Sequence, residues 1–334
     1  MSVEFLVLSW LGFCDEIGRA RPALQSPVKP CAKYNPRIDS GVKHKLLPFT
    51  FLLICFIDGC VASADCPKFL GGHKVGTIQS PLITEASGLA ASRKNRGVLW
   101  IHNDGGPPCV YAITPEGKHL GTYNLEGARV HNWEDIAIGP GPDPNVDYLY
   151  VGDIGDNKTQ RKSIKIYRVP EPPVDANQPA ANVTLSSVEA IELLYPDGPR
   201  DAETLMLDPL TKDIYIISKE GQSKVYRAAY PQSTTAKTTL EYVAKLSWGT
   251  ATGGDISPDG QMIIVRDYFA ASLWRRSKDA PLWRAFEGNE CSIPLIFEQQ
   301  GEAICFDANG SGYFTTSEHK HQPIYYFPME QQKK

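Results

Sequence analysis

The chain has 334 residues, of which 42% are apolar and 22% are charged, with 34 Lys and Arg residues against 38 Asp and Glu residues. This composition is ordinary for a globular protein and excludes a disordered or collagen-like chain. A formal charge of −4 without a run of Lys and Arg argues against nucleic-acid binding, which needs a basic surface to contact phosphates. No apolar run reaches about eighteen residues, so the sequence predicts no membrane-spanning helix.

The first 64 residues are predicted to form a leader and to lie outside the folded domain. Lys43 and Lys45 precede an apolar stretch at residues 46–57, and Asp58 and a run of small residues at 61–64 follow it. A basic flank, a short apolar region and a small-residue cleavage site are typical of a secretory signal peptide. We therefore expect a secreted mature domain at residues 65–334, with a signal anchor or an intracellular chain as the alternatives.

The mature region contains four cysteines: Cys66, Cys109, Cys291 and Cys305. An even number in an oxidising compartment predicts two disulfide bonds and leaves three pairings open. Proximity in the sequence favours Cys291–Cys305, which leaves Cys66–Cys109 to hold the new N-terminus, and buried free thiols are the alternative. Three asparagines lie in glycosylation sequons, as expected of a secreted glycoprotein: Asn157, Asn182 and Asn309.

One pattern recurs five times in the mature region. Each copy has a short strand that begins with a small or acidic residue, a tight turn, a very apolar strand that ends in polar residues, and a further strand with a Val-Tyr or Ile-Tyr pair or, in one copy, without it. Ser87, Glu134, Glu203, Asp255 and Glu302 mark the copies, at spacings of 47, 69, 52 and 47 residues. Periods near 50 with short strands are typical of β-propeller blades. The predicted fold class is therefore an all-β propeller with five blades, and six blades are the alternative.

Two copies depart from the average length of the repeat. The longest copy, which begins at Glu134, is expected to carry a loop around residues 170–181. The last copy ends near Pro328 without an outer strand. We therefore expect residues 75–84 to supply that strand and close the ring.

Polar side chains recur at the two places in each blade that share one face of a propeller. The starts of the innermost strands carry Ser87, Glu134, Glu203, Asp255 and Glu302, and the ends of the second strands carry Asp104, Asp153, Glu220, Asp267 and Glu318. Carboxylates that converge on one axis repel each other unless a cation lies between them, and hard oxygen ligands suit Ca²⁺. The first set predicts an axial calcium site. The alternative is that these acids only cap backbone amides between the blades.

A mixed rim of polar side chains is predicted around that axis. Its members are His102, Asn103, Asp104, Asp156, Asn157, Lys219 and Glu318, with His319 and His321 nearby. We expect the rim to bind a small anionic ligand or an extracellular macromolecule beside the metal.

Three motifs of the second copy carry a resemblance to a known family. They are Trp-Glu-Asp-Ile-Ala at 133–137, Gly-Asp-Ile-Gly-Asp-Asn at 152–157 and Ile-Tyr-Arg-Val-Pro-Glu-Pro at 166–172. The chain resembles a family of extracytoplasmic propellers, which implies the fold over the whole mature region but no activity. It is more loosely similar to the calcium-activated nucleotidases, or apyrases, which are secreted five-bladed propellers that hold a central Ca²⁺ and hydrolyse nucleoside diphosphates. That similarity implies calcium ligands at Ser87, Glu134, Glu203 and Glu302, with Asp255 where a hydroxyl is expected.

Two functions follow from these observations. The first is a calcium-binding extracellular binding or matrix module, which is favoured because no known nucleophile motif occurs. The second is a calcium-dependent hydrolase of phosphoanhydrides or esters. In that case Asp153, Glu220 or Asp267 would activate water, and Arg266 or Lys219 would stabilise negative charge.

Overall fold

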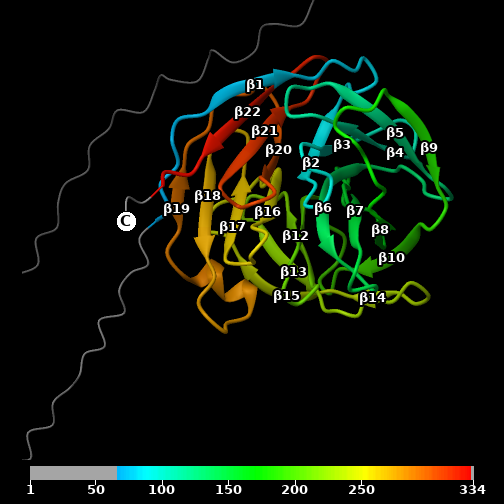
Figure 1. The fold of residues 1–334 in the computed structure, drawn as a ribbon. Coiled ribbons are helices and arrows are strands. Elements are labelled where there is room, and N and C mark those ends of the chain that lie inside the picture. Colours follow the sequence, from blue (N-terminus) through cyan, green and yellow to red (C-terminus); the bar gives the residue numbers. More distant parts are fainter. Residues whose placement is uncertain (1–65, 332–334) are drawn as a thin grey trace, which may run out of the picture. The chain divides into compact units, whose positions relative to one another are not determined.

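The computed structural model of the chain describes residues 66–331. The predicted leader at residues 1–64, with its apolar stretch at 46–57, lies outside the described residues. Within the described part, five β-sheets surround a common centre, as Figure 1 shows. The chain is a five-bladed β-propeller, so the predicted fold class and blade count are confirmed. No helix among residues 66–331 is long and apolar enough to cross a membrane.

Each blade has four antiparallel strands, which follow one another from the axis outward. Blade 1 contains β2 (Ala86–Ala91), β3 (Leu99–Asn103), β4 (Cys109–Ile113) and β5 (His119–Leu125). Blade 2 contains β6 (Trp133–Pro140), β7 (Asp147–Asp153), β8 (Ile164–Pro170) and β10 (Glu189–Leu194). Blade 3 contains β11 (Ala202–Leu207), β12 (Ile214–Ser218), β13 (Lys224–Ala228) and β15 (Glu241–Lys245). Blade 4 contains β16 (Gly253–Ile256), β17 (Met262–Arg266), β18 (Ala271–Arg275) and β19 (Cys291–Ile293). Blade 5 contains β20 (Gly301–Phe306), β21 (Gly312–Ser317), β22 (Pro323–Pro328) and β1 (His73–Thr77).

The hydrophobic core lies between neighbouring blades. Five clusters of buried apolar side chains each combine residues of two adjacent blades. A second strand such as β12, Ile-Tyr-Ile-Ile-Ser, is buried at every position because blades cover both of its faces. This explains why the second strands are continuously apolar in the sequence instead of alternating.

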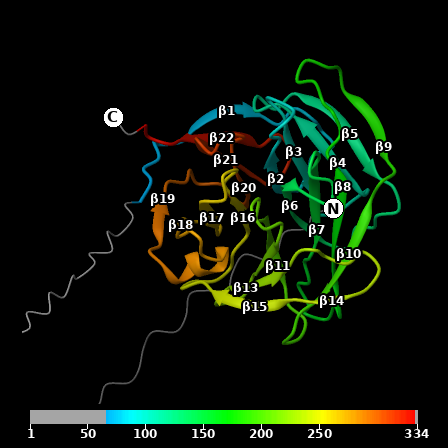
Figure 2. The ribbon, with the colours of Figure 1, turned by 60° about the horizontal axis from the view of Figure 1, so that its bottom comes forward.

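Two short strands cross from one blade to the outer edge of the preceding blade. β9 (Ala181–Leu185) leaves blade 2 and pairs in parallel with β5 of blade 1. β14 (Thr238–Thr239) leaves blade 3 and pairs in parallel with β10 of blade 2. Figure 2 shows both strands at the outer edges of the sheets they join. The loop predicted around residues 170–181 therefore leads into a strand that links two blades.

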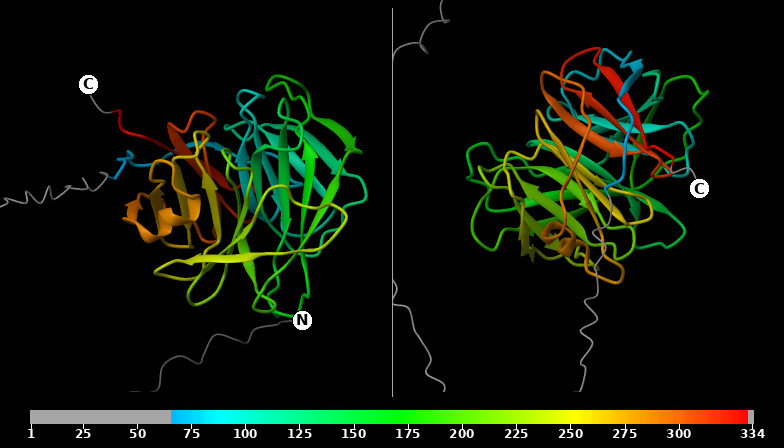
Figure 3. Two further views of the ribbon diagram at one scale, coloured as in Figure 1. Left: turned by 90° about the horizontal axis from the view of Figure 1, so that it is seen from below. Right: turned by 90° about the vertical axis from the view of Figure 1, so that its left-hand side faces the viewer.

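The ring closes between the two ends of the described chain. β1 pairs antiparallel with β22, so residues from the N-terminal side complete blade 5. Figure 3 shows these two strands side by side in both views. Residues 75–84 were predicted to supply the closing strand. Of these, residues 75–77 belong to β1, and the others form the connection to blade 1.

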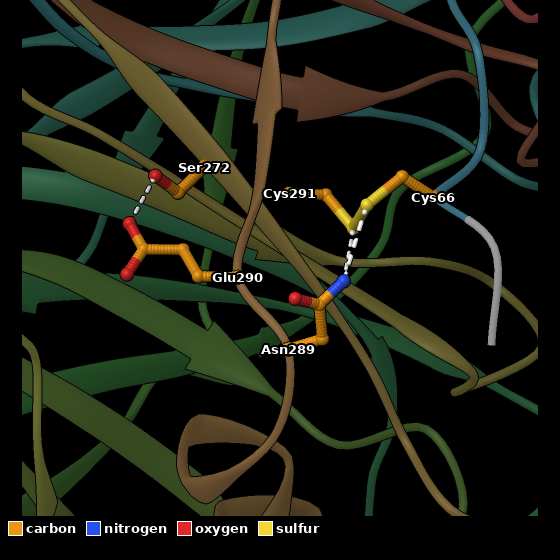
Figure 4. Close-up of a disulfide and its surroundings, with 5 residues drawn as sticks. All are labelled: Cys66, Ser272, Asn289, Glu290 and Cys291. Atoms are coloured by element: carbon orange, nitrogen blue, oxygen red, sulfur yellow. Dashed lines mark hydrogen bonds between the residues drawn. A yellow bond between two sulfur atoms is a disulfide. The ribbon is translucent and has the colours of Figure 1, made fainter. Parts of the chain in front are cut away.

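One disulfide bond joins Cys66 to Cys291 on the outer strand β19 (Figure 4). The predicted pairs Cys291–Cys305 and Cys66–Cys109 are both wrong, since Cys109 and Cys305 are buried free thiols. Between Cys291 and Cys305 the chain passes from the outer edge of blade 4 to the innermost strand of blade 5. The two residues are close in sequence but lie at opposite edges of adjacent blades. Cys305 and Cys109 instead belong to the apolar cluster between blades 5 and 1.

Candidate functional site

The innermost strands begin on one face of the propeller, which we call the upper face. On four of these strands the pairing with the second strand is interrupted at one residue: Ser87, Glu134, Glu203 and Glu302. A bulge of this kind turns a side chain out of the regular alternation of a strand. The four polar residues that mark blades 1, 2, 3 and 5 therefore lie at equivalent positions, and we call them the axial ring.

Hydrogen bonds connect three members of the axial ring. Ser87 Oγ lies 3.3 Å from Glu134 Oε2 and 3.1 Å from Glu302 Oε2, and its single proton serves one of them at a time. Asn132 Nδ2 donates to Glu134 Oε1 at 2.5 Å. Residues that the repeat marks in blades 1, 2 and 5 therefore contact one another in the structure.

Lys219 and Tyr268 complete the connections on the side of blades 3 and 4. The Lys219 ammonium forms an ion pair with Glu203 and donates to the Tyr268 hydroxyl at 2.8 Å. Tyr268 in turn donates to Glu302 Oε1 at 3.1 Å. Tyr268 was not predicted, because it lies in the loop between β17 and β18 and has no counterpart in the other repeats. Lys219, predicted for the rim, lies at the axial ring itself.

The electrostatics of the axial ring show an excess of carboxylates. Burial and the charges of Glu203 and Glu302 raise the pKa of Glu134 well above its ordinary value. Burial and Glu302 raise the pKa of Glu203 to about 8, although Lys219 opposes this shift. Burial alone would lower the pKa of Lys219, but the Glu203 carboxylate raises it overall. One ammonium group therefore faces three carboxyl groups.

Asp255 does not join the axial ring, contrary to the prediction. β16 pairs with β17 without a bulge, so Asp255 stays in the regular alternation of its strand. The Asp255 carboxylate accepts hydrogen bonds from the amides of Phe306, at 2.9 Å, and Ile256, at 2.7 Å. Asp135 does the same between blades 2 and 3, where it accepts from Leu205 at 2.9 Å. Capping of backbone amides between blades, the alternative interpretation of the acids, holds for these two residues.

A second group of acidic residues, which we call the outer carboxyl cluster, lies beside the axial ring where blades 5 and 1 meet. It consists of Glu85, Asp104 and Glu318. Burial and the neighbouring Glu85 carboxyl group raise the pKa of Asp104 to about 6. Burial and the charge of Glu302 raise the pKa of Glu318 to about 8. Among residues 66–331, no Lys, Arg or His forms an ion pair with these three residues or with Glu302.

The remaining rim residues are divided between the interior and the surface. His102 is fully buried, and the Asn103 side chain accepts hydrogen bonds from the amides of Thr84 and Glu85. Both residues therefore support the local structure. Burial lowers the pKa of His102 to about 4. Asp156 and Asn157 line a pocket of about 540 Å³ on the upper face, with Lys158, Arg161 and the Asn132 that contacts Glu134. His319 and His321 are exposed in the loop after Glu318.

The four residues predicted to be catalytic do not converge on one point. Asp153 is buried and accepts from Arg161 at 3.1 Å, and Glu220 accepts from Arg200 at 2.6 Å. Arg266 is fully buried and forms an ion pair with buried Glu298 at 2.7 Å. Asp267 accepts from the amides of Phe269 and Ala270 in its own turn. Each of the four is held by a partner of its own, and these partners are not visible in a repeat pattern.

The axial ring meets part of what a calcium site requires. Three carboxyl groups and one hydroxyl are hard oxygen donors, and Glu203 Oε2 is buried with no hydrogen-bond partner among the described residues. Within residues 66–331, however, no three Asp, Glu, His or Cys side chains lie close enough together to form a ready metal site. The donor chemistry thus suits a hard cation, while the spacing does not form a complete coordination shell.

A larger hollow, of about 630 Å³, lies away from these residues. It opens between blades 3 and 4 near the turns at 208–213 and 257–261, at the ends of the innermost strands opposite the axial ring. It contains none of the predicted site residues. The upper face is therefore the candidate functional site because of its chemistry, and not because of the size of its cavity.

Comparison with known proteins does not assign the chain to a family. No protein-family model matches the chain. No curated protein matches it. Solved structures similar to it include a nidogen/laminin complex (13% identity, 70% of this chain and 73% of the other, TM-score 0.41) and the RRP9 WD40 repeats (10% identity, 80% and 99%, TM-score 0.40). At these values neither protein carries its binding or assembly over to this chain. The resemblances to extracytoplasmic propellers and apyrases stay predictions.

Proposed function

We propose that the chain is a secreted binding module whose upper face holds a calcium ion at the axial ring. The observation that carries the proposal is the excess of carboxyl groups on the axis. Glu134, Glu203 and Glu302 meet there against one ammonium group, and Glu203 Oε2 has no hydrogen-bond partner among the described residues. A divalent cation would balance that charge, and oxygen ligands of this kind suit calcium.

Secretion is supported by two features of the described residues. A disulfide bond, Cys66–Cys291, favours an oxidising compartment. The three sequon asparagines Asn157, Asn182 and Asn309 are all exposed, as acceptors of glycans must be. N-terminal sequencing of protein recovered from the culture medium tests the leader, and a first residue other than one near Asp65 would contradict it.

The calcium claim predicts a rise in melting temperature when calcium is added to the metal-free protein. A ligand that binds only the folded state stabilises it by about 2.7 kcal/mol at a free concentration of about 100 Kd. The rise should be lost in Glu134→Ala with Glu203→Ala. It should persist in Glu116→Ala with Asp279→Ala, which alters exposed residues in turns away from the upper face.

The outcome that contradicts the calcium claim is an unchanged melting temperature of the wild-type protein in saturating calcium, with no calcium in the purified protein by elemental analysis. Lys219 would then be the cation that balances the axial ring. Lys219→Met should in that case lower the stability of the protein at neutral pH without creating a response to calcium.

The alternative, a calcium-dependent hydrolase, draws no support from the placement of its predicted residues. Arg266 is paired with Glu298 in the interior, and Asp267 is engaged in its own turn. Release of phosphate from nucleoside diphosphates in saturating calcium is the direct assay. Turnover that disappears in Glu134→Ala with Glu203→Ala would favour the hydrolase over the binding module.

A further inference from the structure

The hollow between blades 3 and 4 lies on the face of the propeller opposite the axial ring. Its volume of about 630 Å³ falls in the range of small-molecule sites. Its walls come from the turn before β12, from β12 and β13, from the turn before β17, and from the segment that joins β18 to the short 3₁₀-helix η1 (Leu282–Glu287). None of these residues belongs to the axial ring, so the hollow calls for an explanation of its own.

A buried tyrosine presents an unused hydroxyl to the hollow. Tyr215 lines the hollow and is 1% exposed, and its side chain makes no hydrogen bond with any residue in 66–331. Its oxygen is not among the described polar atoms that are shut off from solvent without a partner, so it is open to the hollow. The buried Tyr150, by contrast, donates to the Pro140 carbonyl at 2.9 Å. A buried tyrosine hydroxyl normally has a partner, and for Tyr215 that partner must come from whatever fills the hollow.

Arg227 brings a second unused donor to the same wall. It lies directly opposite Tyr215 on the paired strand β13. Its Nε donates to Asp213 at 2.8 Å and its Nη1 to Glu241 at 3.0 Å. Nη2 donates to no described residue and is not shut off from solvent. The two acids therefore hold the guanidinium group in place and leave one of its N–H edges free.

Arg276 supplies a third donor from the segment after β18. Its Nε donates to the Ala280 carbonyl at 2.8 Å and its Nη1 to the fully buried Asp208 at 3.0 Å. Its Nη2, like that of Arg227, has no described partner and is open to solvent. Asp208 has no capacity left, since it also accepts from the Leu210 amide and the Thr211 hydroxyl. The unused groups in this part of the hollow are therefore donors.

The Tyr215 hydroxyl keeps its proton in this setting. Burial, together with the charges of Asp213 and Asp208, raises its pKa, and the charges of Arg227 and Arg276 oppose the rise. A protonated hydroxyl beside two guanidinium groups can donate to an acceptor that all three share.

Apolar side chains form another part of the wall. Leu282 and Trp283 of η1 line the hollow, and so does Leu210, which is 56% exposed. Leu210 reaches across to the turn of blade 4, where a Cβ on Gly260 would lie 2.7 Å from Leu210 Cγ. An occupant of the hollow therefore needs an apolar body as well as a hydrogen-bond acceptor.

These two requirements select an apolar molecule that carries a carboxylate. The oxygens of a carboxylate accept from the planar N–H groups of arginine and from a hydroxyl, and such charge-assisted hydrogen bonds are stronger than neutral ones. A cation is disfavoured, because Asp208 and Asp213 already accept from the arginines and from backbone amides. The exposed Lys278 and Asp279, which also line the hollow, offset each other in charge.

We propose that the hollow between blades 3 and 4 binds a small organic carboxylate with an apolar body. The carboxylate accepts hydrogen bonds from the Tyr215 hydroxyl, Arg227 and Arg276. The apolar body packs on Leu210 and on Leu282 and Trp283 of η1. This site is additional to the proposed calcium-binding upper face and does not depend on it.

The test is ligand-observed NMR of the full chain with three carboxylates that differ in their apolar bodies: octanoate, 4-phenylbutyrate and indole-3-acetate. Isothermal titration calorimetry then measures the Kd of each binder, and the primary amide of the same molecule is the uncharged probe. We expect at least one carboxylate to bind with a Kd below about 1 mM. Its amide should bind at least about tenfold more weakly, because it lacks the charge-assisted hydrogen bonds.

Two variants of the hollow are compared with one control. Tyr215→Phe should weaken binding about tenfold without lowering the melting temperature, because the hydroxyl has no described partner to lose. Arg227→Gln should weaken binding at least as much. The matched control is Tyr150→Phe, which loses the hydrogen bond to Pro140. It should keep the wild-type affinity while its melting temperature falls.

Three results would overturn the proposal: no binding of any of the three carboxylates at millimolar concentration, equal affinity for acid and amide, and unchanged affinity in Tyr215→Phe. Urea unfolding shows whether each variant folds, and the volume-conserving Tyr215→Phe decides the outcome if Arg227→Gln does not. The rise in melting temperature with calcium should be the same in Tyr215→Phe as in the wild type. Failure of this proposal and failure of the calcium claim are therefore read separately.

Discussion

At the residue scale, the carboxyl groups of the upper face couple the stability of the propeller to pH. Burial and the neighbours Glu302, Asp104 and Glu203 raise the pKa of Glu318 to about 8. A carboxyl group with a raised pKa in the folded state contributes stability that is fully present below its unfolded pKa, near 4.5, and is lost as the pH rises through about 8. Burial lowers the pKa of His102 from 6.5 to about 4, so its contribution to stability instead rises with pH between these two values.

Glu318→Gln is therefore predicted to flatten the fall in melting temperature between mildly acidic and mildly alkaline pH. Glutamine keeps the size of the side chain but cannot ionise, so its electrostatic cost at high pH disappears. The measurement is the melting temperature as a function of pH in metal-free buffer. His102 is common to both proteins, so its effect cancels in the comparison, and Glu116→Gln should follow the wild-type curve. Parallel curves for wild type and Glu318→Gln would show that the Glu318 carboxyl does not titrate in this way.

The repeat in the sequence predicts the residues of the axial ring only where the blades are equivalent. Ser87, Glu134, Glu203 and Glu302 align because each lies at the bulge of its innermost strand. Asp255 aligns by chemical type alone, since the strand that carries it lacks the bulge. Tyr268 could not be predicted, because its position depends on the fold of a loop that has no repeat. Type and spacing are visible in a sequence, but the direction of a side chain is not.

At the element scale, β9 and β14 show a limit of strand prediction. Both follow blade-specific insertions and pair in parallel with the outer strand of the preceding blade. A short strand of this kind is recognisable only through its partner, which lies far away in the sequence. The outer strands β10 and β15 are easier to recognise, because their apolar pattern is local. Each crossing strand ties two blades together at their outer edges.

The disulfide bond is a second element-scale link, and its pairing gives a direct prediction. Peptide mapping under non-reducing conditions should find Cys66 joined to Cys291, with Cys109 and Cys305 alkylated only after unfolding. Cys66→Ser with Cys291→Ser should lower the free energy of unfolding by about 2–5 kcal/mol, because the bond constrains the unfolded chain. Urea unfolding measures this loss, and Cys109→Ser serves as the control for handling of a free thiol. A recovered Cys291–Cys305 peptide would contradict the assignment.

At the scale of the whole molecule, the propeller depends on the contact that closes its ring. β1 completes blade 5, and its end lies against the turn between β4 and β5 of blade 1. The Thr77 amide donates to the Glu116 carbonyl at 3.3 Å, and the Gln79 amide donates to the Gly117 carbonyl at 2.9 Å. The backbones approach so closely that a Cβ at Gly76 would lie 2.3 Å from the Glu116 carbonyl carbon. Glycine at 76 is therefore part of the closure, a role that sequence alone does not show.

Gly76→Val is predicted to weaken the closure between blades 5 and 1. The added side chain meets backbone atoms of Glu116, which cannot move aside as a flexible side chain would. Overpacking of this kind costs about 1–3 kcal/mol of the free energy of unfolding, measured by urea denaturation. Hydrogen exchange should become faster at the amides of β22 that pair with β1. It should change less in blades 2 and 3, which lie away from the contact between blades 5 and 1. Gly71→Val is the matched control, since a Cβ there meets nothing within 4 Å. Equal stability and exchange in the two variants would mean that the ring is held by its other contacts, chiefly the apolar cluster between blades 5 and 1.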